Sequence, residues 1–267
     1  MKKSLRIGLI GAGNLAWNLC GAFNGLEGFE IVQVISRSEA SLQKLATHFY
    51  IPNSGTDFSL LDKNLDLVFI ATNDHAISEV AGSLATHAGD QTVFVHSSGS
   101  VGLEALKPLF PRAGVFYPLQ TFTREHLADF SSIPLFLEGD GKVLAMLNEI
   151  AALLSEKVYV LDSDERRKLH LGAVFACNFP NLMWMITEEL LSGMKGVNID
   201  VYEPLVHETV EKVFKYGALS AQTGPAKRGD SSTMNMHANA LERESPELKK
   251  LYKMLSDLIS DRFDQPG

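Results

Sequence analysis

The sequence predicts an α/β protein in which a Rossmann doubly wound parallel sheet is followed by an all-α C-terminal domain. Three observations predict this. An apolar run at residues 5–10 ends in a glycine-rich turn, short apolar runs then alternate with helix-like stretches, and no strand pattern occurs after residue 161. Continuous apolar strands separated by helices are typical of a parallel sheet that is covered on both faces.

The glycine-rich turn fits the pattern G-x-G-x-x-A through Gly11, Gly13 and Ala16. Gly11 permits a tight turn out of a strand, Gly13 lets the backbone approach a pyrophosphate, and Ala16 lets the next helix pack closely on the sheet. The free N–H groups at the start of that helix, at Asn14 and Leu15, would face the phosphates together with the positive end of the helix dipole. We therefore expect a nucleotide site here rather than an empty structural turn.

The remaining elements of the N-terminal domain follow from the same alternation. Strands are expected at residues 5–10, 30–35, 65–71, 92–96, 113–117, 135–138 and 158–161. Helices are expected at residues 15–23, 39–48, 74–87, 102–109 and 142–155. This βαβα order predicts one parallel sheet with helices on both sides.

The pattern changes at Asp162, an N-cap residue type followed by acidic residues in the first helical turn. Helices are expected from there to about residue 194, and then over residues 202–216, 231–241 and 246–262. We therefore divide the chain into a dinucleotide-binding domain, residues 1–161, and a helical substrate or dimerisation domain, residues 162–267.

Composition limits the classes of partner. The chain has 267 residues, 45% of them hydrophobic, and a net charge of −8. Nucleic acids and anionic membranes both demand a basic face, so neither is expected as a partner. With only two cysteines there is no disulfide framework, and no apolar stretch has the length that a bilayer requires, so we expect a soluble, cytoplasmic protein. The histidines show no metal-ligand spacing, so no metal is expected.

The end of the second strand bears on the choice of dinucleotide. An NAD site usually places an acidic residue there to hold the ribose 2′-hydroxyl. Here the strand is followed by Ser36, Arg37 and Ser38, whose hydroxyls and guanidinium match a 2′-phosphate, and Glu39 comes one residue too late. This favours NADP over NAD, although a solvated loop would also explain Arg37.

Two further strand ends supply candidate site residues, because the carboxyl edge of an open α/β sheet is where ligands bind. Thr72 and Asn73 follow the third apolar strand and are candidates for the ribose or nicotinamide. Ser97 and Ser98 follow the fourth strand, Ser97 as a cofactor contact and Ser98 as a substrate contact. Helix and turn capping is an equally good explanation for these polar residues.

The first long helix of the C-terminal domain carries the candidate catalytic residues. His170 titrates near neutrality and could donate a proton, while Asn178 could orient a carbonyl or imine. At about 100° per residue, His170 and Asn181 lie within about 20° of each other, with Asn178 about 80° away on the flank. Pro180 removes a backbone bond and predicts a kink. A hydrogen-bonded core histidine is the competing interpretation.

Residues 223–237 form the second candidate segment of the C-terminal domain. Asp230 is a plausible cap for the helix that follows, and Arg228 with the free N–H groups of that helix could hold an anionic substrate. His237 lies on the same helix and is a further candidate for substrate binding. An interdomain or dimer loop stabilised by Arg228 and Asp230 is the structural alternative.

These motifs resemble a known family. Residues 70–74 are similar to the Rossmann module of pyrroline-carboxylate reductases and deazaflavin-dependent NADP oxidoreductases. The whole chain resembles Rossmann-like proteins with an all-helical C-terminal domain of unknown function. The resemblance is carried by residues 96–100, 117–122, His170, Asn178, 223–230 and His237. It implies an NADP-linked oxidoreductase with Gln120 at the substrate. It also implies the architecture of 6-phosphogluconate dehydrogenases, whose helical domain closes over the nicotinamide and often dimerises.

The leading hypothesis is therefore an NADP-dependent oxidoreductase that transfers hydride between the nicotinamide and a small carbonyl or imine compound, as a homodimer. The main alternative is a non-catalytic module that senses NADP and reorients its helical domain for a protein partner. A third, weaker interpretation is an oligomeric scaffold that binds no cofactor.

Overall fold

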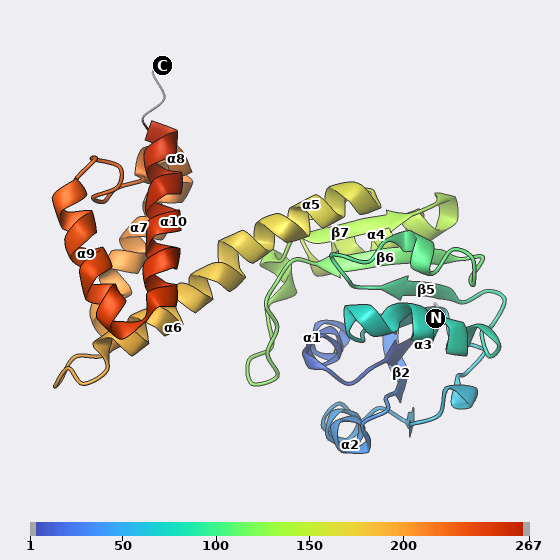
Figure 1. The fold of residues 1–267 in the computed structure, drawn as a ribbon. Coiled ribbons are helices and arrows are strands. Elements are labelled where there is room, and N and C mark those ends of the chain that lie inside the picture. The colour runs from blue at the N-terminus through green and yellow to red at the C-terminus, as the bar shows by residue number, and fades with distance from the viewer. Residues whose placement is uncertain (1–3, 264–267) are drawn as a thin grey trace. The chain divides into compact units, whose positions relative to one another are not determined.

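The computed structural model describes residues 4–263 of the chain. It divides into two compact units, Met1–Asn181 and Leu182–Gly267 (Figure 1). The first unit thus extends past residue 161, because the helix that begins at Ser163 packs on the sheet.

The first unit is built on one eight-stranded sheet with the order β3-β2-β1-β4-β5-β6-β7-β8. All neighbouring strands are parallel except β6 and β7, which are antiparallel. The strands are β1 (Leu5–Ile10), β2 (Phe29–Ile35), β3 (Asn53–Gly55), β4 (Leu67–Ile70), β5 (Val93–His96), β6 (Ala113–Pro118), β7 (Leu135–Gly139) and β8 (Val158–Val160). The first six strands have the Rossmann order, so the predicted fold class is confirmed.

Helices cover both faces of this sheet, as the continuous apolar strands predict. The helices of the first unit are α1 (Asn14–Phe23), α2 (Glu39–His48), α3 (Ile77–Ala85), α4 (Gly141–Leu154) and α5 (Ser163–Ala173), with α6 (Phe179–Leu191) crossing into the second unit. Along β4, Leu67 and Phe69 pack with α1, α2 and α4, whereas Val68 and Ile70 pack with α3. Alternate side chains of one strand thus belong to two separate cores.

Two local predictions were wrong. The helix expected at residues 102–109 is only a short 3₁₀ turn, Leu103–Ala105, because Pro108 removes a backbone donor and disfavours helix in the residue before it. The three-residue strand β3 was not expected, since Asn53–Gly55 carries no apolar pattern. At an edge of the sheet, pairing with β2 alone suffices to form it.

The continuous helical stretch Ser163–Leu191 is long enough and apolar enough to cross a membrane, judged by length and composition alone. The mean hydropathy of its most apolar window is 1.2. The expectation that no segment reaches this length was therefore too strict. Core helices of soluble proteins pass the same criterion.

The second unit is helical throughout its described residues. It contains the end of α6 and the helices α7 (Glu203–Tyr216), α8 (Ala218–Ala221), α9 (Ser231–Glu244) and α10 (Pro246–Phe263). Asp230 caps α9 by accepting a hydrogen bond from Thr233 N at 3.0 Å, as expected. Among the described residues of this unit only Ala226 is buried, and many large apolar side chains of its helices face solvent.

Candidate functional site

The glycine turn between β1 and α1 has the geometry of a phosphate-binding turn. Gly11 has a φ of +112°, and a Cβ on it would lie 2.5 Å from the carbonyl oxygen of Ala71, so only glycine fits. A Cβ on Gly13 would meet nothing within 4 Å, which leaves open space in front of the backbone. No side chain caps the first N–H groups of α1, at Asn14 and Leu15. These groups are available to an anion.

Two buried hydroxyls lie at the same edge of the sheet without a hydrogen-bond partner among the described residues. They are Thr72 Oγ1, after β4, and Ser97 Oγ, after β5. The Thr72 Cγ2 atom lies only 3.5 Å from the position of a Cβ on Gly11, so this side chain adjoins the turn. An unpaired buried hydroxyl is costly, so a bound group or water is expected to supply its partner. The residues present therefore fit a dinucleotide.

The other predicted cofactor residues have different surroundings. Ser38 caps α2 by accepting a hydrogen bond from Ser41 N at 3.4 Å, a structural role that was not predicted from the sequence. Arg37 is exposed and forms no ion pair or hydrogen bond within the described residues, while Ser36 is half-buried beside it. Asn73 is exposed after β4. Of the three residues after β2, Arg37 thus has the side chain most available to a phosphate.

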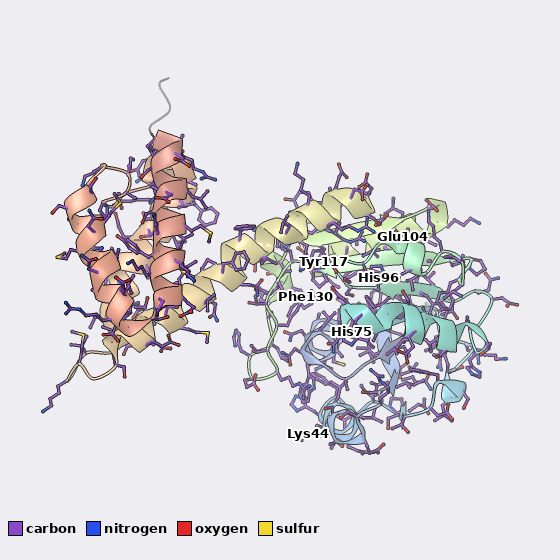
Figure 2. The ribbon with its side chains drawn as sticks, viewed as in Figure 1. Lys44, His75, His96, Glu104, Tyr117 and Phe130 are labelled. Atoms are coloured by element: carbon purple, nitrogen blue, oxygen red, sulfur yellow. The ribbon has the colours of Figure 1, made fainter. Side chains whose placement is uncertain are left out.

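The loop after β5 is organised by a buried histidine. His96 Nδ1 accepts a hydrogen bond from Ser98 N at 3.2 Å, and its Nε2–H donates to Gly102 O at 3.3 Å. Accepting at Nδ1 requires a neutral ring. Burial, together with the positive charge of Arg166, lowers the pKa of His96 to about 4. His96 is therefore a neutral, structural residue that holds the loop at the site (Figure 2).

The predicted substrate residues Ser98 and Gln120 are both occupied by local contacts. Ser98 Oγ accepts hydrogen bonds from the backbone N–H groups of Ser100 and Val101, at 3.1 and 3.0 Å. Gln120 Oε1 accepts one from Thr121 N at 2.8 Å. These bonds match the capping interpretation, and a role in substrate binding stays a prediction for both residues.

Helix α5 is attached to this loop by Arg166, whose side chain is 1% exposed. Its guanidinium donates to the backbone oxygens of Ser98 and Val101 and forms a buried ion pair with Glu138 on β7. Arg166 was not predicted as a site residue. A charged residue in a helical first turn normally indicates solvent exposure, and only the packing of α5 on the sheet shows otherwise.

The attachment of α5 brings His170 to the carboxyl edge of the sheet. His170 Nδ1 lies 3.0 Å from the hydroxyl of Tyr117, which stands at the end of β6 near His96 (Figure 2). A Cβ on Gly99 would lie 2.5 Å from the same ring nitrogen, so the histidine ring packs directly on the loop. Burial raises the pKa of Tyr117 to about 12, and the phenol stays protonated at neutral pH.

Tyr117 was missed as a site residue, although it lies in a motif that carried the family resemblance. A polar-tipped side chain at the carboxyl end of a buried strand is the signal that could have identified it. The hydrogen bond to His170 joins residues 53 positions apart, and no sequence pattern predicts that pairing.

A π-helical turn at Val174–Asn178 lies directly before Phe179 and Pro180, and the predicted kink stays a prediction. Phe179 N donates to Val174 O across this turn. A π turn holds one extra residue, so the rotation from His170 to Asn178 equals about seven helical steps instead of eight. That places Asn178 within about 20° of His170 and moves Asn181 to about 80°. The exposed Asn178, and not Asn181, thus shares a face with His170.

The remaining candidates belong to the second unit. His237 Nδ1 lies 2.9 Å from the hydroxyl of Tyr252, which fixes its ring between α9 and α10. Arg228 is exposed in the turn before α9. Hydrogen bonds from Thr233 lower the pKa of Asp230, and the charge of Arg228 adds to this effect. Arg228 and Asp230 therefore belong to one structured turn, and their part in substrate binding stays a prediction.

Comparisons with known proteins agree with this architecture. A family model described as a Rossmann-like domain matches residues 1–120, and a domain of unknown function, DUF2520, matches residues 133–259. The chain is 37% identical to Bacteroides fragilis BF3122, proposed to be an NADP oxidoreductase. That match covers 98% of this chain and 100% of the other, with a TM-score of 0.89. Among curated proteins no match is found.

More distant solved structures share the fold. Protein TM1727 from Thermotoga maritima is 23% identical, with 97% of this chain and 98% of that chain covered and a TM-score of 0.71. A reductive aminase from Aspergillus terreus, solved with NADPH and ethyl levulinate, is 12% identical, with 97% and 95% covered and a TM-score of 0.72. At these identities the likeness extends to the fold alone.

Proposed function

The chain belongs to the family of Rossmann-like proteins that carry the DUF2520 domain, and on that basis we propose that it is an NADP-dependent oxidoreductase acting on a small carbonyl or imine compound. The observation that carries the proposal is the glycine turn with two unpartnered buried hydroxyls, Thr72 and Ser97, at the same edge of the sheet. When bound, the nicotinamide supplies or accepts the hydride.

The residues assigned to the cofactor fall into groups, and each group would bind a different part of the dinucleotide. The N–H groups of Gly13, Asn14 and Leu15 bind the pyrophosphate, and the hydroxyls of Thr72 and Ser97 bind the ribose and nicotinamide end. Arg37, with Ser36 beside it, binds a 2′-phosphate, which favours NADP over NAD.

In this proposal His170 and Asn178 act directly on the substrate. Tyr117 holds one ring nitrogen of His170. When the Tyr117 hydroxyl donates to Nδ1, the proton of the neutral ring is on Nε2, which makes no hydrogen bond within the described residues. That nitrogen is positioned to exchange a proton with a substrate oxygen or nitrogen. Asn178, on the same helix face, orients the carbonyl or imine. Substrate binding by Arg228 and His237, which belong to the second unit, stays a prediction.

The helical unit supports a homodimer. Layers of helices are stable when each buries an apolar face, yet Leu205, Val213 and Phe214 of α7 are all exposed. Exposed apolar surface of this kind is expected to be covered by association with a partner. A second copy of the chain would cover it by an isologous contact, the commonest arrangement in soluble oligomers. We therefore infer that the protein assembles as a dimer through residues 182–263.

Calorimetric titration of the protein with NADPH and NADH tests the cofactor assignment. We expect NADPH to bind more tightly than NADH, and R37Q to weaken NADPH binding by about tenfold or more while leaving NADH binding unchanged, because it removes a charge-assisted contact to the 2′-phosphate alone. Failure of the wild-type protein to bind either nucleotide would overturn the proposal. Tight binding with no hydride transfer across a carbonyl and imine panel would instead support the sensing module.

A further inference from the structure

The segment that joins β6 to β7, residues 119–134, is attached to the first helix of the dinucleotide site (Figure 1). Asn14 Nδ2 donates to Phe122 O at 2.9 Å, and Asn18 Nδ2 donates to Thr123 O at 2.7 Å. Ala128 N donates in turn to Asn18 Oδ1 at 2.8 Å. Two asparagines on successive turns of α1 thus hold this loop against the phosphate-binding end of the helix.

The attachment brings Arg124 to the N-terminus of α1. Its Nε donates to Asn14 Oδ1 at 3.1 Å, and Asn14 is the first residue of the helix. Within the described residues the guanidinium has no carboxylate partner. The neighbouring carboxylate of Glu125 accepts a hydrogen bond from the backbone N–H of Arg124 instead. The two terminal amino groups of Arg124 make no hydrogen bond within the same residues.

This placement is electrostatically unfavourable unless an anion is present. The N-terminus of a helix carries a partial positive charge, so a cation beside it is repelled, whereas an anion there is stabilised. Gly13 leaves open space at this same point, and the buried hydroxyls of Thr72 and Ser97 lack partners at the adjoining sheet edge. These features together indicate a ligand with negative charge in front of α1.

We propose that Arg124 is a phosphate-binding residue of the dinucleotide site, with its guanidinium on the pyrophosphate. The inference rests on the proposed function and extends the site to a loop far along the chain. The guanidinium presents two free amino groups in a planar fork, which suits the paired oxygens of a phosphate. Asn14 has a double role, since its backbone N–H faces the phosphate and its side chain orients Arg124.

Arg124 and Arg37 differ in what they recognise. The pyrophosphate is common to NADPH and NADH, whereas the 2′-phosphate occurs only in NADPH. Removal of Arg124 therefore lowers the affinity for both nucleotides by the same factor. Removal of Arg37 lowers the affinity for NADPH alone. This difference separates the two assignments in one set of titrations.

The experiment measures dissociation constants of NADPH and NADH by calorimetry for the wild type, R124Q, R124K and R112Q. We expect R124Q to raise the dissociation constants of both nucleotides by about tenfold to a hundredfold, which is the range for the loss of a hydrogen bond to a charged group. R124K keeps the charge and should be intermediate. R112Q is the matched control, because Arg112 bonds Gln91 at the opposite edge of the sheet and its loss should leave both constants unchanged.

The melting temperature without nucleotide separates binding from loop anchoring. Because Arg124 lies at the positive end of a helix, R124Q should leave the melting temperature unchanged or raise it, while the gain in melting temperature on adding NADPH shrinks. Equal nucleotide affinity in R124Q and wild type overturns this inference alone. A lowered melting temperature with an unchanged gain on adding NADPH shows an anchor instead, and absent binding in the wild type overturns the proposed function as well.

Discussion

His96 shows how an ionisable side chain is placed in this core without a charge. It donates to Gly102 O and accepts from Ser98 N, so both ring nitrogens are satisfied in the neutral state only. Protonation would replace the acceptor at Nδ1 by a donor that faces the N–H of Ser98. The turn that carries Ser97 toward the site therefore depends on a neutral histidine.

This dependence predicts a loss of stability in mild acid. The pKa of His96 falls from an ordinary 6.5 to about 4 on folding, so the unfolded chain binds a proton between these values and the folded chain does not. Stability is fully present above pH 6.5 and declines as the pH falls through 4. Urea unfolding at several pH values should show a smaller acid-dependent loss for H96N than for wild type. Identical pH dependence in the two proteins would contradict this account.

A second prediction follows from the hydrogen bond between Tyr117 and His170. H170A should lower the turnover of an identified substrate by about a hundredfold or more, as expected for loss of a general acid. Y117F removes one neutral hydrogen bond, so a decrease of about fivefold to tenfold is expected. Nucleotide dissociation constants should stay at the wild-type values in both variants.

Nitrogen-15 NMR spectra of the His170 ring test whether Tyr117 positions this ring. In Y117F the balance between the two neutral tautomers should change, because the partner of Nδ1 is lost. An unchanged tautomer balance with reduced turnover would assign Tyr117 another role.

At the scale of the elements, α5 is joined to the sheet by one buried arginine. Arg166 contacts the loop after β5 and pairs with Glu138 on β7, so a single side chain connects three elements. Its neighbour Arg167 pairs with Glu104 and Asp164 on the surface. The two residues are adjacent and of the same type, and they differ in burial.

Substitution of these two arginines separates a buried ion pair from an exposed one. R166A should lower the free energy of unfolding by about 3–5 kcal/mol, because it leaves Glu138 without its partner in a largely buried position. R167A should leave the free energy of unfolding nearly unchanged, since its ion pairs are exposed to water. Both values come from urea unfolding of the purified variants, and similar losses for the two would refute the assigned role of Arg166.

At the scale of the whole molecule, the two units differ in how their apolar residues are used. The first unit buries two clusters of side chains, one on each face of its sheet. The second unit has a single buried residue among those described, and Phe214 on α7 is 88% exposed. In the proposed dimer, the interface would cover apolar side chains of this unit that the single chain leaves exposed.

The proposed dimer predicts different effects on the oligomeric state for substitutions of two exposed aromatic residues. F214E places a charge on α7 and should shift the protein to a monomer in sedimentation velocity experiments, because an unpaired charge in an apolar interface is costly. Y50E makes the same type of change on the first unit, where Tyr50 is 90% exposed, and should leave the sedimentation coefficient unaltered. A wild-type protein that is monomeric at micromolar concentration would exclude the dimer.

The sequence by itself determined the alternation of strands and helices in most of the first unit, and the glycine turn. Strands buried on both faces are apolar along their whole length, and the turn needs glycine at Gly11 for backbone reasons alone. Local chemistry likewise predicted the caps at Asp162 and Asp230. These features depend on residues close together in the chain, where pattern and propensity act directly.

Only the tertiary structure decided which side chains meet. Tyr117 pairs with His170 across 53 positions, and Arg124 meets Asn14 across 110. The π turn moved Asn178 onto the face of His170, because it adds one residue to the helical turn between them. Such contacts arise from packing between elements whose sequences carry no mutual signal, so they become visible only when the chain is folded.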